Sequence, residues 1–236
     1  MGEVQFANDI LYLEERAFGP KGLQMPRWVF FDCALVPGFV AGFAARADRL
    51  PRAVADVLQI HGEREWVPIS LFIIIPTIAP GEWVAHNLCS VNSLLPRDDQ
   101  YYGLGFLSKG FGLWYANVET CCGITQWKSP ALRLHAQYGE FEILTAFTPV
   151  HDYPHTLTYR LTVEPHLWPQ FFTKSNGGVG NPRLQPTDIE VEPESDQSLV
   201  SLQRRLEEGR DRYCLDSLEL LKKAPGDKLS VYKLTQ

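Results

Sequence analysis

A single lysine stands in a glycine-rich apolar segment, and its amine is the strongest candidate for chemistry in this chain. The segment reads Leu-Gly-Phe-Leu-Ser-Lys-Gly-Phe-Gly-Leu, with the lysine at position 109. Apolar surroundings disfavour a charged ammonium, and an uncharged amine attacks ketones to form an imine. Lys109 is therefore a candidate catalytic residue. The alternative is that its ammonium reaches solvent from the end of a packed segment.

An acid and a second lysine extend this candidate site. Glu119 stands among small and apolar residues, where its carboxyl group could position a substrate or move a proton. On an alternating strand it would instead face water. Lys128, in the stretch Gln-Trp-Lys-Ser-Pro, is a reserve nucleophile, although a residue before Ser-Pro is commonly a charge in a loop. The residues predicted as catalytic are therefore Lys109, Glu119 and Lys128.

Aromatic side chains and one histidine are the candidates for contact with a substrate. Aromatic residues make up 12% of the chain, and they suit both a protein core and the wall of a small-molecule pocket. The residues predicted to bind substrate are Trp114, Tyr115, Trp127 and His135. The alternative for each of them is a place in the core, where a histidine is held by hydrogen bonds.

The remaining reactive residues do not predict a metal or cofactor site. Cys121 and Cys122 are adjacent, so on a strand they point to opposite faces and do not share one zinc ion. His151 and His155 would share a face only on a helix, and nearby prolines favour a turn. Residues 103–108 lack the third glycine of a dinucleotide-binding fingerprint. We expect no metal and no cofactor.

Charge and composition limit the classes of partner. The 236-residue chain has a formal net charge of −6 and no Lys/Arg cluster suited to phosphates, so no nucleic-acid partner is expected. Its longest apolar run, Leu71–Ala79, contains Pro76 and is far shorter than the roughly 20 residues of a membrane-spanning helix. There is no signal-peptide pattern, and five scattered cysteines suggest no disulfide framework. We expect a cytoplasmic protein with a small-molecule ligand, no membrane partner, and homo-oligomers formed through edge strands.

Turn residues and alternating runs predict the elements that position these side chains. With 17 prolines and 18 glycines, the chain favours strands and turns over a helix bundle. We predict an amphipathic helix over 48–60, and helical spacing around Lys109 that three glycines weaken by about 1 kcal/mol each. The predicted strands are 66–78, 82–95, 113–126, 131–137, 141–148 and 156–163. These elements predict an α+β single domain over 1–236, with a core at 27–170, a loop at 174–197 and a helical C-terminal appendage at 198–236.

The order of these elements resembles the acetoacetate decarboxylase superfamily. The likeness covers Arg27–Glu164 and rests on the central lysine-bearing segment and the aromatic-glycine turn at Tyr138-Gly139-Glu140-Phe141. It implies a predominantly antiparallel sheet that closes into a cone-like barrel around an apolar pocket, with peripheral helices. It also implies Schiff-base chemistry, here carried by Lys109, since the family's own lysine position has no lysine in this chain.

Two functional classes follow. The first is an enzyme, a decarboxylase or lyase, that acts on a small keto acid through the pocket amine of Lys109. The second is a non-catalytic protein that binds a small metabolite in the same barrel.

Overall fold

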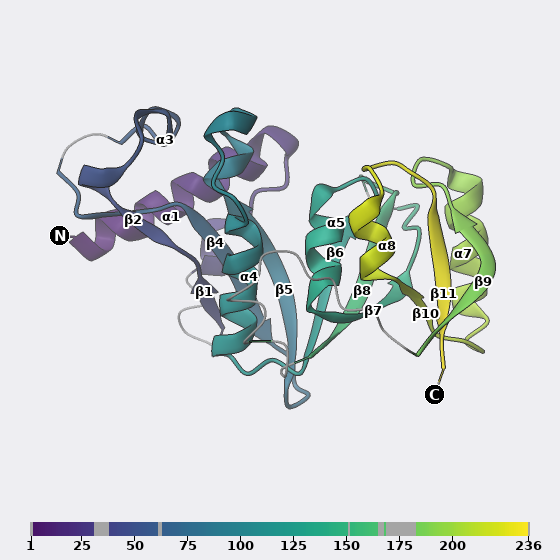
Figure 1. Ribbon diagram of the computed structural model, residues 1–236. Coiled ribbons are helices and arrows are strands. Elements are labelled where there is room, and N and C mark those ends of the chain that lie inside the picture. The colour runs from purple at the N-terminus through teal and green to yellow at the C-terminus, as the bar shows by residue number, and fades with distance from the viewer. Residues whose placement is uncertain are drawn as a thin grey trace. The chain divides into compact units, whose positions relative to one another are not determined.

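The protein is described here by a computed structural model that covers residues 2–30, 38–60, 63–150, 152–164, 168 and 183–235. The chain divides into two compact units (Figure 1). Unit 1 contains Met1–Ile78 and Ala85–Asn117, and unit 2 contains Ala79–Val84 and Val118–Gln236. Each unit has its own helices and buried side chains, and each is considered by itself below.

A nine-stranded mixed sheet holds most of the strands. Its order is β1-β4-β5-β6-β8-β7-β10-β11-β9, and a separate two-stranded sheet pairs β2 with β3. The registered pairs are antiparallel except for β5 with β6, which is parallel. The strands are β1 Phe39–Ala41, β2 Ala44–Arg46, β3 Trp66–Pro68, β4 Ser70–Pro76, β5 Glu82–Ser90, β6 Thr120–Gln126, β7 Gly139–Thr145, β8 Thr156–Val163, β9 Leu184–Val191, β10 Tyr213–Leu215 and β11 Leu229–Leu234.

The closed or cone-like barrel predicted from the sequence is wrong. The sheet is open, because β1 and β9 end the strand order and do not pair with each other. The α+β class and the mostly antiparallel pairing are confirmed. Alternation of apolar and polar residues indicates that one face of a strand is exposed to solvent. A sheet closes into a barrel only if its first and last strands pair, and alternation carries no information about which distant strands pair.

The long apolar run of unit 1 forms β4, and both faces of this strand are buried. Leu71 and Ile73 belong to a core cluster that includes Leu13 of α1, which spans Gly2–Phe18. Phe72, between them, is fully buried and lies against Gly112 of α4. A strand covered on both faces reads as a continuous apolar run rather than an alternating one.

The lysine-bearing segment is a helix, α4, over Leu104–Tyr115. Its glycines cost helix propensity, but Gly112 lets the helix approach β4 closely: a Cβ there would lie 2.7 Å from Cδ1 of Phe72. Ser108 strengthens this contact, since its hydroxyl lies 2.7 Å from that of Ser70 on β4 and donates to the Leu104 carbonyl. Tertiary packing therefore overrides the weak propensity.

Unit 2 differs from the sequence prediction in three segments. Residues 131–137, expected as a strand, lie mostly in helix α5, Pro130–His135. Its start carries a recognisable signal, because the Ser129 side chain accepts from Ala131 N and proline occupies the first turn. The segment expected as a loop at 174–197 contains β9 within its described part. The C-terminal part predicted as a helical appendage contains two helices, but β10 and β11 within it are strands of the large sheet.

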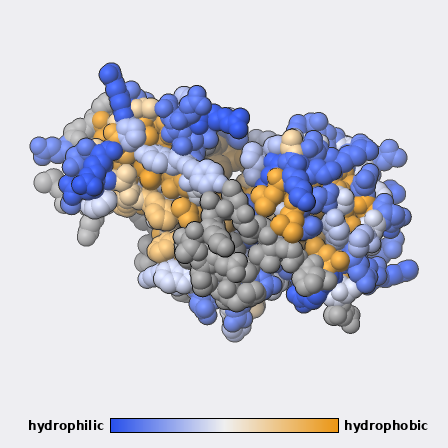
Figure 2. Space-filling model, viewed as in Figure 1, coloured by the Kyte–Doolittle hydropathy of each residue, from blue (hydrophilic) through white to orange (hydrophobic). Residues whose placement is uncertain are grey.

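Two further helices of unit 2 surround these strands: α7 spans Asp196–Glu207 and α8 spans Ser217–Lys222. On β8, Leu157, Tyr159 and Leu161 are buried while the residues between them are half-buried, which is the alternation expected of a sheet with one apolar face. In Figure 2 the visible face of the protein is mostly hydrophilic, with smaller hydrophobic patches. Among the described residues, no helix is both long and apolar enough to span a membrane.

Candidate functional site

The parallel pairing of β5 with β6 is short, and it defines the most unusual part of the sheet. Glu82–Val84 pair in register with Thr120–Cys122, and α4 lies between the two strands in the sequence. β5 continues as a strand from Ala85 to Ser90, in unit 1, without a further registered partner on β6 in the described structure. Strand, helix and parallel strand in this order form a crossover unit, a common framework for ligand sites at strand ends.

The loop from β5 to α4 is held in place by two amide side chains. Asn92 donates from Nδ2 to the Tyr101 carbonyl at 2.7 Å and accepts at Oδ1 from Tyr101 N at 2.8 Å. Gln100 donates from Nε2 to the carbonyls of Asn92 and Leu95, at 3.0 and 3.1 Å. These bonds fix where α4 begins relative to the end of β5.

The first turn of α4 is suited to an anion. Its N-cap, Gly103, has φ 69°, a left-handed conformation that glycine adopts without strain, and it offers no side chain to accept from the first-turn N–H groups. A Cβ on Gly103 would have no atom within 4 Å, so the space beside the cap is open. The first turn holds no acidic residue. The helix dipole and the first-turn amides of a helix favour negative charge at its start.

Lys109 is fully buried in unit 1, with 0% of its surface exposed. Its Nζ lies 5.9 Å from the centre of the Phe72 ring, so the amine is close to the aromatic face of β4. The burial required by the amine hypothesis is therefore present. The groove of unit 1 described below does not include Lys109 among its lining residues.

The other two residues predicted as catalytic are exposed and belong to unit 2, whereas Lys109 belongs to unit 1. Glu119 lies beside the turn at Gly81, because its backbone N–H donates to the Gly81 carbonyl at 3.0 Å. Lys128 forms an ion pair with Glu194. The surroundings of Lys128 fit the alternative interpretation of a solvated loop charge.

The four residues predicted to bind substrate separate into two groups. Trp114 and Tyr115 of α4 are exposed by 49% and 68%, and both rings contact Phe111 in unit 1. Trp127 and His135 are buried in unit 2: the indole Nε1 of Trp127 donates to the Ala146 carbonyl at 2.7 Å, and the His135 ring stacks on a buried tyrosine. Trp114 and Tyr115 therefore belong to one unit, and Trp127 and His135 belong to the other.

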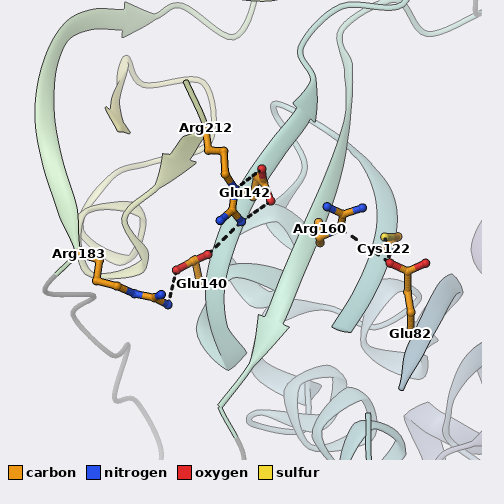
Figure 3. A network of polar contacts seen from close by, with 7 residues as sticks. All are labelled: Glu82, Cys122, Glu140, Glu142, Arg160, Arg183 and Arg212. Atoms are coloured by element: carbon orange, nitrogen blue, oxygen red, sulfur yellow. Dashed lines mark hydrogen bonds and ion pairs between the residues drawn. The ribbon is translucent and has the colours of Figure 1, made fainter. Parts of the chain in front are cut away.

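Two buried carboxylates on β7 form the centre of an ionic network in unit 2 (Figure 3). Arg212 binds Glu142 with two hydrogen bonds, from Nε to Oε1 at 2.8 Å and from Nη2 to Oε2 at 2.7 Å. The same Nη2 lies 3.4 Å from Glu140, and Arg183 Nη2 donates to the second oxygen of Glu140 at 2.7 Å. Hydrogen bonding to Glu142 raises the pKa of Arg212, so its charge persists at all ordinary pH values.

The network continues across the sheet to a thiol. Cys122 lies opposite Arg160 of β8, its Sγ is 4.0 Å from Glu82, and Arg160 Nε is 3.9 Å from the same carboxylate. That Nε is buried and makes no hydrogen bond within the described structure. Burial raises the pKa of Cys122 more than Arg160 lowers it, so the thiol stays protonated at neutral pH. Three carboxylates balance three guanidinium groups in Figure 3, which is typical of a structural ion network rather than an anion site.

Metal binding has no support in the described part of the chain, where no group of three or more His, Cys, Asp or Glu side chains is arranged to hold an ion. Comparisons with known proteins add no assignment: neither protein-family models nor curated proteins match this chain.

The start of α4 is the feature that sequence reasoning missed. The stretch 103–108 does not match the three-glycine fingerprint, which describes one particular loop geometry. The signal in the sequence was a single glycine, Gly103, before a helix. It indicates an anion site only together with the parallel crossover that joins β5 to β6, which the sequence does not reveal.

Proposed function

We propose that unit 1 binds a phosphate-bearing acyl carrier of the coenzyme A type, and that the protein transfers the acyl group from its thioester to a nucleophilic acceptor. The observation that carries this proposal is the glycine-led start of α4, which has no side-chain cap and follows β5 after the connection at residues 91–103. It replaces the expectation that the protein uses no cofactor.

The phosphate end of the carrier suits the start of α4. Amide groups at a helix start bind phosphate oxygens without a basic side chain, and the open space beside Gly103 allows close approach. The Asn92 and Gln100 hydrogen bonds hold the loop in advance, so less entropy is lost when a ligand binds.

The arm of the carrier suits the edge of β5. An extended chain with amide groups adds to a strand edge through main-chain hydrogen bonds. Pantetheine, the arm of coenzyme A, is such a chain, and the stretch Ala85–Ser90 extends beyond the registered pairing with β6. Both features belong to unit 1, and the hydrogen bonds of Asn92 and Gln100 hold the connection between them, so the proposal assigns both to one ligand.

The transfer step needs a group that accepts a proton. An acceptor amine or alcohol attacks the thioester carbonyl, the C–S bond breaks, and the acceptor proton ends on the released thiol. His86 on β5 is accessible, and partial desolvation lowers its pKa, so its ring is uncharged at neutral pH. We assign it the role of general base.

The test is coenzyme A binding by calorimetry to the wild type and to Gly103→Asp and Gly103→Asn. Asp and Asn enter the left-handed conformation more readily than other side chains, so the two variants carry similar backbone strain while only the Asp carboxylate repels phosphate. We expect Asp to weaken binding roughly tenfold or more, the neutral Asn to weaken it less, and pantetheine without phosphate to bind poorly. The proposal fails if the wild type does not bind coenzyme A, or if Asp and Asn have equal effects. Thiol release with an amine acceptor, lost in His86→Gln, then tests the transfer step.

A second candidate function is the keto-acid enzyme with an imine-forming lysine, favoured by the complete burial of Lys109. An amine held away from water can be uncharged and nucleophilic. Incubation with a panel of keto acids and borohydride, followed by mass spectrometry, should give a stable adduct on Lys109 that is absent in Lys109→Met. If no lysine is modified, this candidate is rejected, and a ligand that binds without reaction would favour the non-catalytic alternative.

A further inference from the structure

A groove of about 560 Å³ lies in unit 1 between the first half of α1 and the β2–β3 pair. Phe6, Ile10 and Trp66 give it an apolar surface, and the exposed Trp66 ring, 46% accessible, is open to a ligand. This volume falls within the range of small-molecule sites. The groove shares no residue with the start of α4 or with Figure 3.

The polar floor of the groove is already neutralised. Arg64 holds Asp9 with a fork of two hydrogen bonds, Nε to Oδ2 at 2.9 Å and Nη2 to Oδ1 at 3.4 Å. Gln5 donates from Nε2 to the same Asp9 carboxylate at 2.9 Å. Both members of the ion pair are largely buried, with side-chain exposures of 15% and 13%. The pair therefore shapes the floor without giving it a net charge.

The rim of the groove is negative. Glu63 and Glu65 line it and are exposed, one on each side of Arg64 in the sequence. Arg46, on the neighbouring strand, is held by its own ion pair with Asp48. Among the described residues of this region, the carboxylates outnumber the guanidinium groups by two, so the rim attracts cations.

We propose that this groove binds a small organic ammonium ion with an apolar body, such as an arylalkyl amine. The apolar body occupies the surface formed by Phe6, Ile10 and Trp66. The ammonium group lies by the carboxylates of Glu63 and Glu65, where the face of an indole ring adds a further attraction for a cation. The proposal stands on the groove alone and does not depend on the acyl-carrier proposal.

Three probes of similar shape and different charge test it: 2-phenylethylamine, 2-phenylethanol and 3-phenylpropanoate. Binding is followed by calorimetry and by the indole signals in NMR spectra at neutral pH. We expect the amine to bind at least roughly tenfold more tightly than the alcohol, and the carboxylate to bind least. Equal affinity of amine and alcohol, or no binding of the amine, overturns the proposal.

Variants separate the charge from the apolar surface. Glu63→Gln combined with Glu65→Gln should remove most of the preference for the amine over the alcohol while leaving alcohol binding unchanged. Trp66→Leu should weaken both probes. Glu208→Gln, which removes an exposed carboxylate from unit 2, is the control and should leave all affinities as in the wild type. If the control lowers the preference as much as the double variant, the attraction comes from overall charge, and the assigned groove is wrong.

Discussion

Glu14 is a buried acid in unit 1, with 2% of its surface exposed. Its Oε1 accepts hydrogen bonds from Met25 N at 2.8 Å and from Asn87 Nδ2 at 2.6 Å. Burial raises the pKa of Glu14, and these two hydrogen bonds oppose the rise only in part. At the scale of single residues, the protonation of Glu14 is therefore linked to the folding of the protein.

The sign of this linkage is definite. Because the folded protein holds the Glu14 proton to higher pH than the unfolded chain, stability falls as pH rises from the unfolded pKa through the folded pKa. Glu14→Gln keeps an oxygen acceptor for both donors and stays neutral. We expect the free energy of unfolding of this variant to exceed that of the wild type at neutral pH, with the gain shrinking towards pH 4.

Urea unfolding across this pH range checks the prediction. Glu208→Gln is the control, because its side chain is exposed and is not among the groups that shift the pKa of Glu14. A Glu14→Gln variant whose stability advantage is the same at every pH would contradict the proposed linkage.

At the scale of elements, the contact between α4 and β4 decides whether a glycine-rich segment is helical. A methyl group on Gly112 would lie 2.7 Å from Cδ1 of Phe72 and 3.3 Å from Cβ of Ala41. Ordinarily, alanine stabilises a helix interior by about 1 kcal/mol relative to glycine. Here overpacking costs of about 1–3 kcal/mol compete with that gain.

We therefore expect Gly112→Ala to destabilise unit 1 by up to roughly 2 kcal/mol, as the net of these two effects. The same change in a Phe72→Leu background should cost less, because the smaller side chain gives way. Unfolding free energies of the four proteins in this double-mutant cycle measure the coupling. No coupling between the two positions would show that the helix packs differently from the structure.

At the scale of the whole molecule, the nine-stranded sheet is open, and β5 with β6 is the parallel pair among its registered strands in the described structure. The predicted strands at 141–148 and 156–163 are confirmed as β7 and β8, because each combines alternation with clear turns at its ends. The pairing of β7 with its neighbour on the other side could not be predicted from the sequence. There β10 pairs with β7, and β11 pairs with β10, although both come from the C-terminal part of the chain.

Local sequence determined the elements whose signals are complete within a few residues. The α7 helix follows from a serine cap and leucines at helical spacing, and the burial of both faces of β4 agrees with its continuous apolar run. Only the tertiary structure decided that the sheet stays open, that the predicted catalytic residues Lys109 and Glu119 belong to different units, and that Gly103 begins a helix after a parallel strand. Pairing between distant strands is a property of the assembled chain, since it depends on contacts whose energies no short stretch of sequence contains.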